Sequence, residues 1–386
     1  NAQWAHTIYY DKNIKDYSEH IENCLYEGLS SNKEKIILNI EYGIYPIKKM
    51  INIDYIPTGQ YSTIPHKEII IQGVSKDGVF PIFDTSNNQI PVSVFRFAGN
   101  INTPSNLTVR LKNLQIKGNN VSFYNSHPFF GKKAEPVTAI QLLNMKTFEV
   151  ENVKVTNFYG NGIVSDNSYS ENHDKKYMIE SPSISNFSFI NSWSENHLNN
   201  SSVGIRLGYV KNGIIKNCIL KNDLLSSKYP AFVGIDLEQR TDKSIIKNNE
   251  ITGFRVGIWT ECDYGGHQII SNRISQTLVG INFSEDCQQD IRRRSLYSGN
   301  LVSENTFEYT DEYDKINFKA NDWGYITIYK PSFMLENLKI ENNVFKSSGL
   351  KEKKVYTERG KTFNKNKIYI DLKNQEKVTL KNNIYQ

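Results

Sequence analysis

One short pattern recurs along the chain, and this repetition most constrains the fold. An apolar residue, two variable positions, an Asn, one further variable position and another apolar residue return at intervals of 23 to 40 residues. Repetition at such a period is typical of a solenoid, in which each repeat packs only on its neighbours. The copies centre on Asn217, Asn249, Asn272, Asn305, Asn343 and Asn383, and three earlier copies carry Leu114, Val153 and Phe187 at that position.

A second pattern lies between these copies. It is a small residue followed by a short strand, beginning at Ala139, Gly162, Gly204, Gly234, Gly257 and Gly280. Some starts are only 23 residues apart, which is too few for a four-stranded propeller blade, and the leucine spacing of leucine-rich repeats is absent. Two short strands per repeat predict an all-β fold, a right-handed parallel β-helix of about ten coils stacked ~4.8 Å apart.

The repeated Asn has a structural interpretation. An amide turned inward at a corner of the coil can hydrogen-bond to the next amide and to the backbone of the turn, as stacked amides do in cross-β ladders. We therefore expect an Asn ladder that holds successive coils in register and takes no part in chemistry.

The first residues follow a different pattern. The segment "DKNIKDYSEHIENCLYEGL" predicts an amphipathic helix with Asp11 as its N-cap and Gly28 near its end. A solenoid end must be covered, so we interpret this helix as a cap and Cys24 as core packing within it. The predicted domains are a cap over 1–60 and a β-helix over 61–386. The apolar face of the helix comprises Ile14, Tyr17, Ile21, Cys24, Leu25 and Leu29.

A capping helix, the segment "KIILNIEYGIYPI" and Asn-laddered coils resemble the pectate-lyase-like β-helix superfamily of carbohydrate-active enzymes. The resemblance covers nearly the whole chain at the level of fold and implies saccharide chemistry on an outer strand face. Of the polygalacturonase motifs, the chain offers only "GGH" at 265–267 and "RIS" at 273–275. The pectate lyase and pectin esterase signatures are absent, so no catalytic residue transfers by motif.

The second strand of each repeat presents two outward positions, and stacking the repeats turns them into columns. The first column reads Gln141, Val164, Arg206, Asp236, Trp259 and Asn282, and the second reads Leu143, Asp166, Gly208, Glu238, Glu261 and Ser284. On consecutive coils, one arginine, one tryptophan and three acids thus form a patch of unusual composition. Like charges on one face repel, which favours a functional site over an ordinary solvated surface.

The patch has the spacing of a glycosidase acid–base pair. Asp236 and Glu238 lie about 6.5–7 Å apart along the strand, and Glu238 and Glu261 about 5 Å apart across strands, so both the inverting and the retaining separations occur. Arg206 is expected to keep Asp236 ionised as base or nucleophile, with Glu238 or Glu261 as the acid. Trp259 offers a flat surface to a sugar ring. Further predicted substrate contacts are Asn282, Asp263, His267 and Asp166.

Two other readings of the patch stay open. The carboxylates of Asp236, Glu238, Glu261 and Asp263 would suit Ca²⁺, as in a metal-assisted lyase or epimerase with Arg206 or Lys211 as base. A non-catalytic adhesin or tailspike-like module would bind glycan without a carboxylate pair. The preferred hypothesis is a hydrolase, which needs no cofactor.

Net charge, hydropathy and the first residue indicate which substrate and which location to expect for such a protein. A net charge of +5 suits an acidic polysaccharide, and no motif for DNA or RNA is present. No run of about 18 apolar residues predicts a membrane span. A start at Asn1 is compatible with a processed secretory protein, so we expect a secreted or cell-envelope location.

Two further features concern the surface of the predicted solenoid. Long insertions at 122–136, 165–182 and 284–298 are expected to form binding walls. Cys262 and Cys287 are separated by one 23-residue coil and two further positions, which places them within possible reach of a disulfide.

Overall fold

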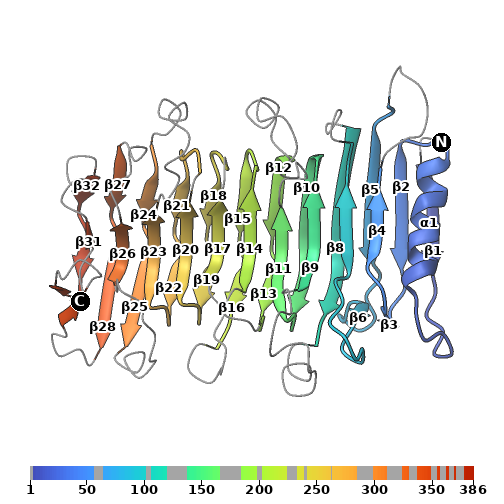
Figure 1. Ribbon diagram of the computed structural model, residues 1–386, viewed down its shortest axis with the longest axis horizontal. Coiled ribbons are helices and arrows are strands. Elements are labelled where there is room, and N and C mark those ends of the chain that lie inside the picture. Colours follow the sequence, from blue (N-terminus) through green and yellow to red (C-terminus); the bar gives the residue numbers. More distant parts are fainter. Residues whose placement is uncertain are drawn as a thin grey trace. The chain divides into compact units, whose positions relative to one another are not determined.

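Parallel strands make up almost the whole structure. The computed structural model describes residues 3–55, 64–100, 106–119, 137–165, 184–197, 202–223, 233–238, 241–261, 263–284, 299–310, 324–329, 337–348, 354–356, 362–364, 369–370 and 378–386. They fall into two compact units, Asn1–Leu198 with Gly208–Lys211, and Asn199–Leu207 with Asn212–Gln386. Within each unit, parallel strands stack in register as in a β-helix, which confirms the predicted fold class (Figure 1). The domain boundary near residue 60 stays a prediction.

The first unit contains one helix, α1 (Ser18–Ser30), and three stacks of strands. One stack is β1 (Gln3–Ile8), β2 (Lys35–Ile40), β5 (Lys67–Gly73), β8 (Leu107–Lys117), β10 (Met145–Thr156) and β12 (Ile184–Ile190). The second is β4 (Ile51–Asp54), β7 (Phe95–Ala98), β9 (Val137–Leu143) and β11 (Gly160–Ser165). The third begins with β3 (Ile44–Pro46) and β6 (Ile82–Asp84), and β6 pairs with the C-terminal half of β8, so this stack continues through the same halves of β8 and β10 to β13 (Trp193–Glu195).

The second unit has three stacks and a small hairpin. One stack is β14 (Val203–Gly208), β17 (Val233–Glu238), β20 (Val256–Glu261), β23 (Val279–Ser284), β26 (Gly324–Tyr329) and β31 (Tyr369–Ile370). Another is β15 (Gly213–Lys216), β18 (Ile245–Lys247), β21 (Gln268–Ile270), β24 (Leu301–Ser303), β27 (Leu338–Glu341) and β32 (Val378–Lys381). The third is β16 (Ile219–Lys221), β19 (Glu250–Thr252), β22 (Arg273–Ser275), β25 (Thr306–Thr310), β28 (Val344–Ser348) and β33 (Ile384–Tyr385). The hairpin pairs β29 (Lys354–Tyr356) with β30 (Thr362–Asn364).

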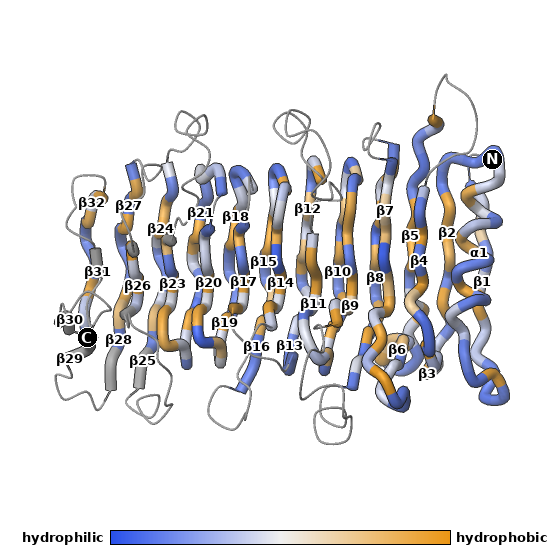
Figure 2. The backbone as a smooth tube through the Cα atoms, in the orientation of Figure 1, coloured by the Kyte–Doolittle hydropathy of each residue, from blue (hydrophilic) through white to orange (hydrophobic). Residues whose placement is uncertain are grey.

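The alternation of apolar and polar residues along each strand decides which side chains form the core. In β2, for example, Ile36, Leu38 and Ile40 are fully buried, while the residues between them are partly exposed. Figure 2 shows the same alternation of hydrophobic and hydrophilic positions along other strands. Since every coil repeats this pattern in register, each unit buries a continuous apolar interior.

The predicted Asn ladder is confirmed in the second unit. The side chains of Asn249, Asn272, Asn305 and Asn343 are buried, and each Nδ2 donates to the Oδ1 of the next Asn in the series at 3.0–3.1 Å, ending at Asn383. Each Nδ2 also donates to a backbone carbonyl of the coil before, and each Oδ1 accepts from a backbone N–H. Every polar group of a buried amide is therefore used.

The predicted register of the ladder is wrong at two copies. The position that precedes Asn249 is occupied by Cys218, whose backbone N–H donates to Asn249 Oδ1 at 2.9 Å, and not by Asn217. Likewise, Val153 N donates to the hydroxyl of Ser192, so Ser192 and not Phe187 continues that column. Phe187 instead pairs with Phe148 inside the core.

The residue just before the ladder position explains this slip. Asn217, Asn248, Asn342 and Asn382 have φ between 54° and 58°, in the left-handed region that Asn tolerates better than most residues. The turn therefore has two consecutive positions at which Asn is common, one for backbone conformation and one for the ladder, although Ser271 and Glu304 hold the first of them before Asn272 and Asn305. Where only the first is Asn, as at Asn217, the sequence pattern alone aligns it with the wrong column.

Helix α1 begins later than its pattern predicts. Its first residue is Ser18, whose N–H donates to Asp16 Oδ1 at 2.9 Å, so Asp11 is not the N-cap. Ile14 is 37% exposed and lies outside the helix. The rest of the predicted face, including Ile21 and Leu25, is buried. In the described part of the chain, no helix has the length and hydropathy needed to cross a membrane.

We predict that Asn272→Leu destabilises the second unit. The substitution removes one amide of the ladder and leaves the side-chain amide and the backbone N–H of Asn249 without their acceptor, at a cost of ~1–3 kcal/mol. Urea denaturation of the purified protein measures this change. The same substitution at the exposed Asn186 of β12 serves as control and should change stability by less than about 0.5 kcal/mol. Equal stability of the two variants would contradict a structural role for the ladder.

Candidate active site

The predicted outward columns exist in the second unit. In the parallel pair of β17 and β20, Asp236 lies opposite Trp259 and Glu238 lies opposite Glu261. In the next pair, Trp259 lies opposite Asn282. Because parallel strands stand about 4.8 Å apart, these side chains form rows of near neighbours on one face. The strand register that the sequence predicts for this patch is therefore confirmed.

A column of glycines lies beside the patch. A Cβ atom added to Gly204 would lie 2.6 Å from the carbonyl oxygen of Gly234, and one added to Gly234 would lie 2.7 Å from that of Gly257. Gly257 stands in the same relation to Gly280, at 2.6 Å. The backbones at this corner approach too closely for any side chain, and this is the physical reason for the small residue that begins each repeat.

Arg206 connects two of the three acids. Its Nε lies 3.4 Å from Asp236 Oδ2 and 3.2 Å from Glu238 Oε2. The guanidinium is 30% exposed and Glu238 is 25% exposed, so both retain contact with solvent. Arg206 thus holds Asp236 and Glu238 together in one group, as expected from their places in the columns.

Asp236 differs from the other two residues because it is almost completely buried, with only 4% of its surface exposed. Its Oδ1 atom has no hydrogen-bond partner among the described residues. The pKa of this carboxyl is raised from 3.8 to about 8, mainly by burial and then by the charges of Glu238 and Glu261, while Arg206 acts in the opposite direction. Asp236 therefore keeps its proton at neutral pH.

This result overturns one expectation. The sequence predicts that Asp236 faces water and that Arg206 keeps it ionised. Arg206 is in place, but the loss of hydration on burial outweighs its attraction, which is divided between two carboxylates. The acid of the group is Asp236, and Glu238 is the carboxylate beside it.

Trp259 provides the apolar side of the patch. It packs against a cluster of buried valines, one from each of four successive strands, namely Val203, Val233, Val256 and Val279. Since Trp259 is also the register neighbour of Asp236, the buried carboxyl lies between an arginine on one strand and an indole on another. Burial removes hydration from the carboxyl, and this is the largest cause of its raised pKa.

Asn282 continues the first column and contacts a residue that the sequence pattern did not include. The Thr327 hydroxyl donates to Asn282 Oδ1 at 2.8 Å, and the two residues are paired in β23 and β26. β26 reads "GYITIY", but its Gly324 lies opposite Val279 and not opposite Gly280. Aligning this repeat by its glycine therefore gives the wrong register. Aligning it by the apolar alternation of Ile326 and Ile328 would have given the correct one.

Asp263 and His267 lie close together but turn away from solvent. His267 is fully buried, and its Nε2 lies 2.6 Å from Asp263 Oδ2. His267 Nδ1 accepts from the backbone N–H of Ser244, so the proton of the neutral ring sits on Nε2 and is donated to Asp263. This arrangement favours a structural role at the turn over the predicted contact with substrate.

Several other predicted features lie outside the described residues. These are Asp166, Cys262 and Cys287, together with most of the insertions at 122–136, 165–182 and 284–298. Their roles stay predictions. The two remaining cysteines, Cys24 and Cys218, are buried free thiols.

The carboxylates also bear on a metal at this site. Asp236, Glu238 and Glu261 are oxygen donors of the kind that Ca²⁺ prefers. However, Arg206 already contacts the first two, and the protonated Asp236 is a poor ligand for a cation. The arrangement of these side chains therefore suits proton transfer better than the binding of a hard cation.

Comparison with known proteins identifies the fold. No family model matches the chain, and no curated protein matches it by sequence. Several solved structures, however, are similar to the chain. The chain is similar to DFA-IIIase from Arthrobacter chlorophenolicus, a cysteine-to-alanine variant in complex with DFA-III, with a TM-score of 0.53 and 14% identity over 90% of this chain and 76% of that one. It is also similar to the lacto-N-biosidase from Eubacterium ramulus, with a TM-score of 0.50 and 12% identity over 93% and 63%.

The chain has the pectate-lyase-like parallel β-helix fold. A pectate lyase also matches, with a TM-score of 0.45 and 11% identity over 90% of this chain and 70% of that one. The resemblance found in the sequence is confirmed at the level of fold by the two structures with TM-scores of 0.53 and 0.50. The structural neighbours are carbohydrate-active enzymes, and they include a lyase, a glycosidase and epimerases.

The buried Asp236 predicts a specific dependence of stability on pH. Its folded pKa lies above its unfolded value, so between pH 4 and 8 the folded state binds more protons than the unfolded state. The stability that Asp236 provides is complete below pH 4 and is lost as the pH rises to about 8. Asp236→Asn removes this loss, and the variant should exceed the wild type by an amount that grows across this window to a few kcal/mol.

Urea denaturation of wild type and Asp236→Asn at several pH values measures this difference. Glu250→Gln, on the neighbouring face of the same unit, is the matched control and should follow the wild type throughout. Parallel stability curves for wild type and Asp236→Asn between pH 4 and 8 would show that Asp236 is not held protonated.

Proposed function

We propose that the chain is a glycoside hydrolase that cleaves a polysaccharide, with Asp236 as general acid and Glu238 as its carboxylate partner. The observation that carries the proposal is the state of Asp236, a buried carboxyl that keeps its proton at neutral pH directly beside a second carboxylate. Glycosidases usually cleave the glycosidic bond with two carboxyl groups, and their different environments keep one protonated and the other ionised.

In this mechanism Asp236 protonates the glycosidic oxygen as the bond to the anomeric carbon breaks. Its pKa of about 8 places the proton within reach of transfer near neutral pH. Trp259, next to Asp236 in the register, gives a sugar ring an apolar face on which to stack. Arg206 compensates the negative charge of the ionised partner and that of Asp236 after it has lost its proton.

The shared contact with Arg206 limits the separation of the two carboxyl groups, and this limit is compatible with a double displacement. Asp236 Oδ2 and Glu238 Oε2 lie 3.4 and 3.2 Å from one Arg206 Nε atom, so they are at most about 6.6 Å apart. Retaining glycosidases hold their carboxyl groups roughly 5–5.5 Å apart, and inverting ones roughly 6.5–9.5 Å. Glu238 would then attack the anomeric carbon, and Asp236, now ionised, would activate water to release the sugar. Glu261, opposite Glu238, would position substrate.

A metal-assisted lyase or epimerase fits the same residues less well. Such a reaction needs free carboxylates to hold the cation and a free base to remove a proton next to a uronate carboxylate. Arg206 contacts both Asp236 and Glu238, and Asp236 is protonated.

Because polymeric glycans occur mainly outside the cytoplasm, the proposal also includes a secreted or cell-envelope enzyme.

We predict that Asp236→Asn and Glu238→Gln each lower turnover by roughly 10²–10⁴-fold, the usual contribution of a positioned acid or base. Glu261→Gln should have a milder effect, and Trp259→Ala should mainly raise KM. Release of new reducing ends from a panel of neutral and acidic polysaccharides is the measurement. Activity should fall as the pH rises through about 8, and this limb should be absent from the residual activity of Asp236→Asn.

The control for these variants is Glu250→Gln, which removes a charge from a neighbouring strand of the same unit and should leave turnover unchanged. Nuclear magnetic resonance of the first product reports its anomeric configuration, and retention is expected. An unsaturated product that absorbs in the near ultraviolet would show a lyase. Binding without any cleavage would show a glycan-binding module, and wild-type turnover in the Asp236 and Glu238 variants would remove these residues from the mechanism.

A further inference from the structure

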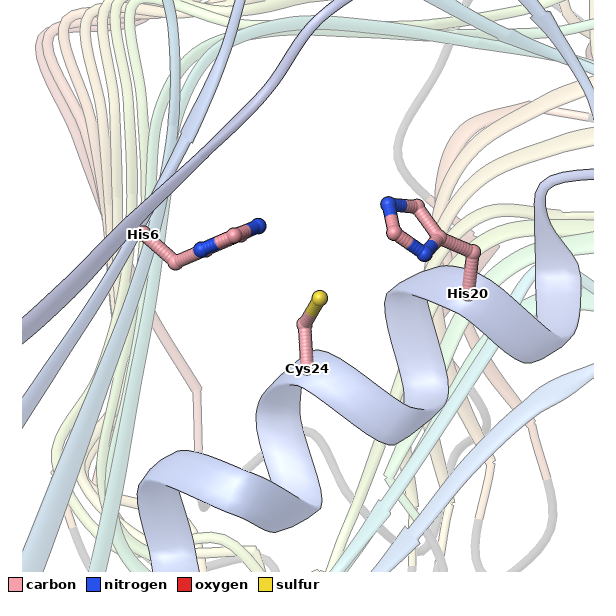
Figure 3. A group of neighbouring side chains, drawn as sticks. All are labelled: His6, His20 and Cys24. Carbon is pink, nitrogen blue, oxygen red and sulfur yellow. The ribbon is translucent and has the colours of Figure 1, made fainter.

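A second group of side chains with ligand chemistry lies in the first unit, at the N-terminal helix. His6 is in β1, and His20 and Cys24 are on α1. His20 and Cys24 are four residues apart, so they share one face of the helix on successive turns. Figure 3 shows the two imidazoles and the thiol turned toward a common space. One nitrogen of each ring and the Cys24 Sγ all lie within 4.8 Å of one another.

This arrangement is not explained by packing alone. The apolar face of α1 is formed by Ile21, Leu25 and Leu29, which are buried. Cys24 is buried as well, but its thiol meets two exposed histidines, so the predicted role in core packing describes only part of its surroundings. The rings are themselves held by neighbours, since His6 stacks on Trp4 and His20 lies against Tyr17. These contacts place both rings beside the Cys24 thiol and leave small changes of their side-chain torsions open.

The donor set selects the kind of ion. Two imidazoles and a thiolate are borderline and soft ligands that suit Zn²⁺ and exclude the hard cations Ca²⁺ and Mg²⁺. A tetrahedral zinc with bonds of 2.0–2.3 Å separates its ligand atoms by roughly 3.3–3.8 Å. The present separations therefore need a contraction of about 1 Å, which small rotations of exposed side chains provide. The exposure of both histidines leaves the fourth position to water.

We infer that His6, His20 and Cys24 form a Zn²⁺ site that joins strand β1 to helix α1. The thiol gives up its proton to solvent when the ion binds, as required for a metal-bound cysteine. The three ligands are brought together only in the folded state. The ion therefore binds the folded state preferentially and stabilises it. All three ligands belong to the first unit, whereas the proposed catalytic group belongs to the second, so this site is independent of the proposed function.

Metal titration of the purified protein, free of any histidine tag, tests the inference. Isothermal titration calorimetry should detect one Zn²⁺ per chain, and Zn²⁺ should raise the midpoint of thermal unfolding whereas Ca²⁺ should not. Co²⁺ in place of Zn²⁺ should give the visible bands of a tetrahedral ion and a thiolate-to-cobalt charge-transfer band in the near ultraviolet. The last feature reports directly on the cysteine ligand.

Variants identify the ligands. His6→Gln and His20→Gln change exposed side chains, so they should fold normally and weaken Zn²⁺ binding by at least about tenfold. Cys24→Ser should remove the charge-transfer band. His66→Gln, which alters a histidine of the same unit paired with Glu34, is the control and should bind as the wild type does. Absence of a one-to-one Zn²⁺ complex, or binding that survives both histidine variants, would overturn the inference.

Discussion

The hydrogen bonding of each coil to the next, in a fixed parallel register, is the constraint on which the rest of the structure depends. In the second unit this register is held at one turn by the buried amides of Asn249, Asn272 and Asn305, each bonded to the following amide and to backbone on both sides. Once the register is fixed, residues at equivalent positions of successive strands must be neighbours. Both the interior and the outward charged patch follow from that geometry.

Within the patch, the balance between hydration and charge attraction decides the chemistry. Asp236 contacts Arg206, which by itself would keep a carboxyl ionised. The side chain is nevertheless so deeply buried, with Trp259 opposite it, that its pKa rises to about 8. Glu238 shares the same arginine but stays partly exposed. Two acids on one strand thereby lie in different environments, Asp236 buried and Glu238 partly exposed, and the proposed acid–base mechanism rests on this difference.

Sequence reasoning reached the fold and the membership of the patch because both depend on periodicity. Alternation at period two places Asp236 and Glu238 on one face, and the repeat length places Trp259 and Glu261 beside them. It failed where Asn is common at two neighbouring positions of the same turn. Asn217 lies in the left-handed position of its turn, and Cys218 occupies the ladder.

The burial of Asp236 could not be predicted from the sequence for a different reason. It depends on how side chains of neighbouring strands pack around the carboxyl, and no pattern within one strand reports such packing. The same limit applies to His267, whose place in a loop suggested exposure but whose ring is enclosed and bonded to Asp263. It applies again to Cys24, which the helical pattern placed correctly without showing the two histidines beside its thiol.

The protonation of Asp236 is the central claim, and titration of its carboxyl carbon tests it most directly. Protein labelled with carbon-13 at the aspartate carboxyl groups can be followed by nuclear magnetic resonance from pH 4 to 10, and the Asp236 resonance is the one missing from Asp236→Asn. The account predicts a chemical-shift transition centred at about 8. A transition near 4, the value of an ordinary exposed aspartate, would contradict it.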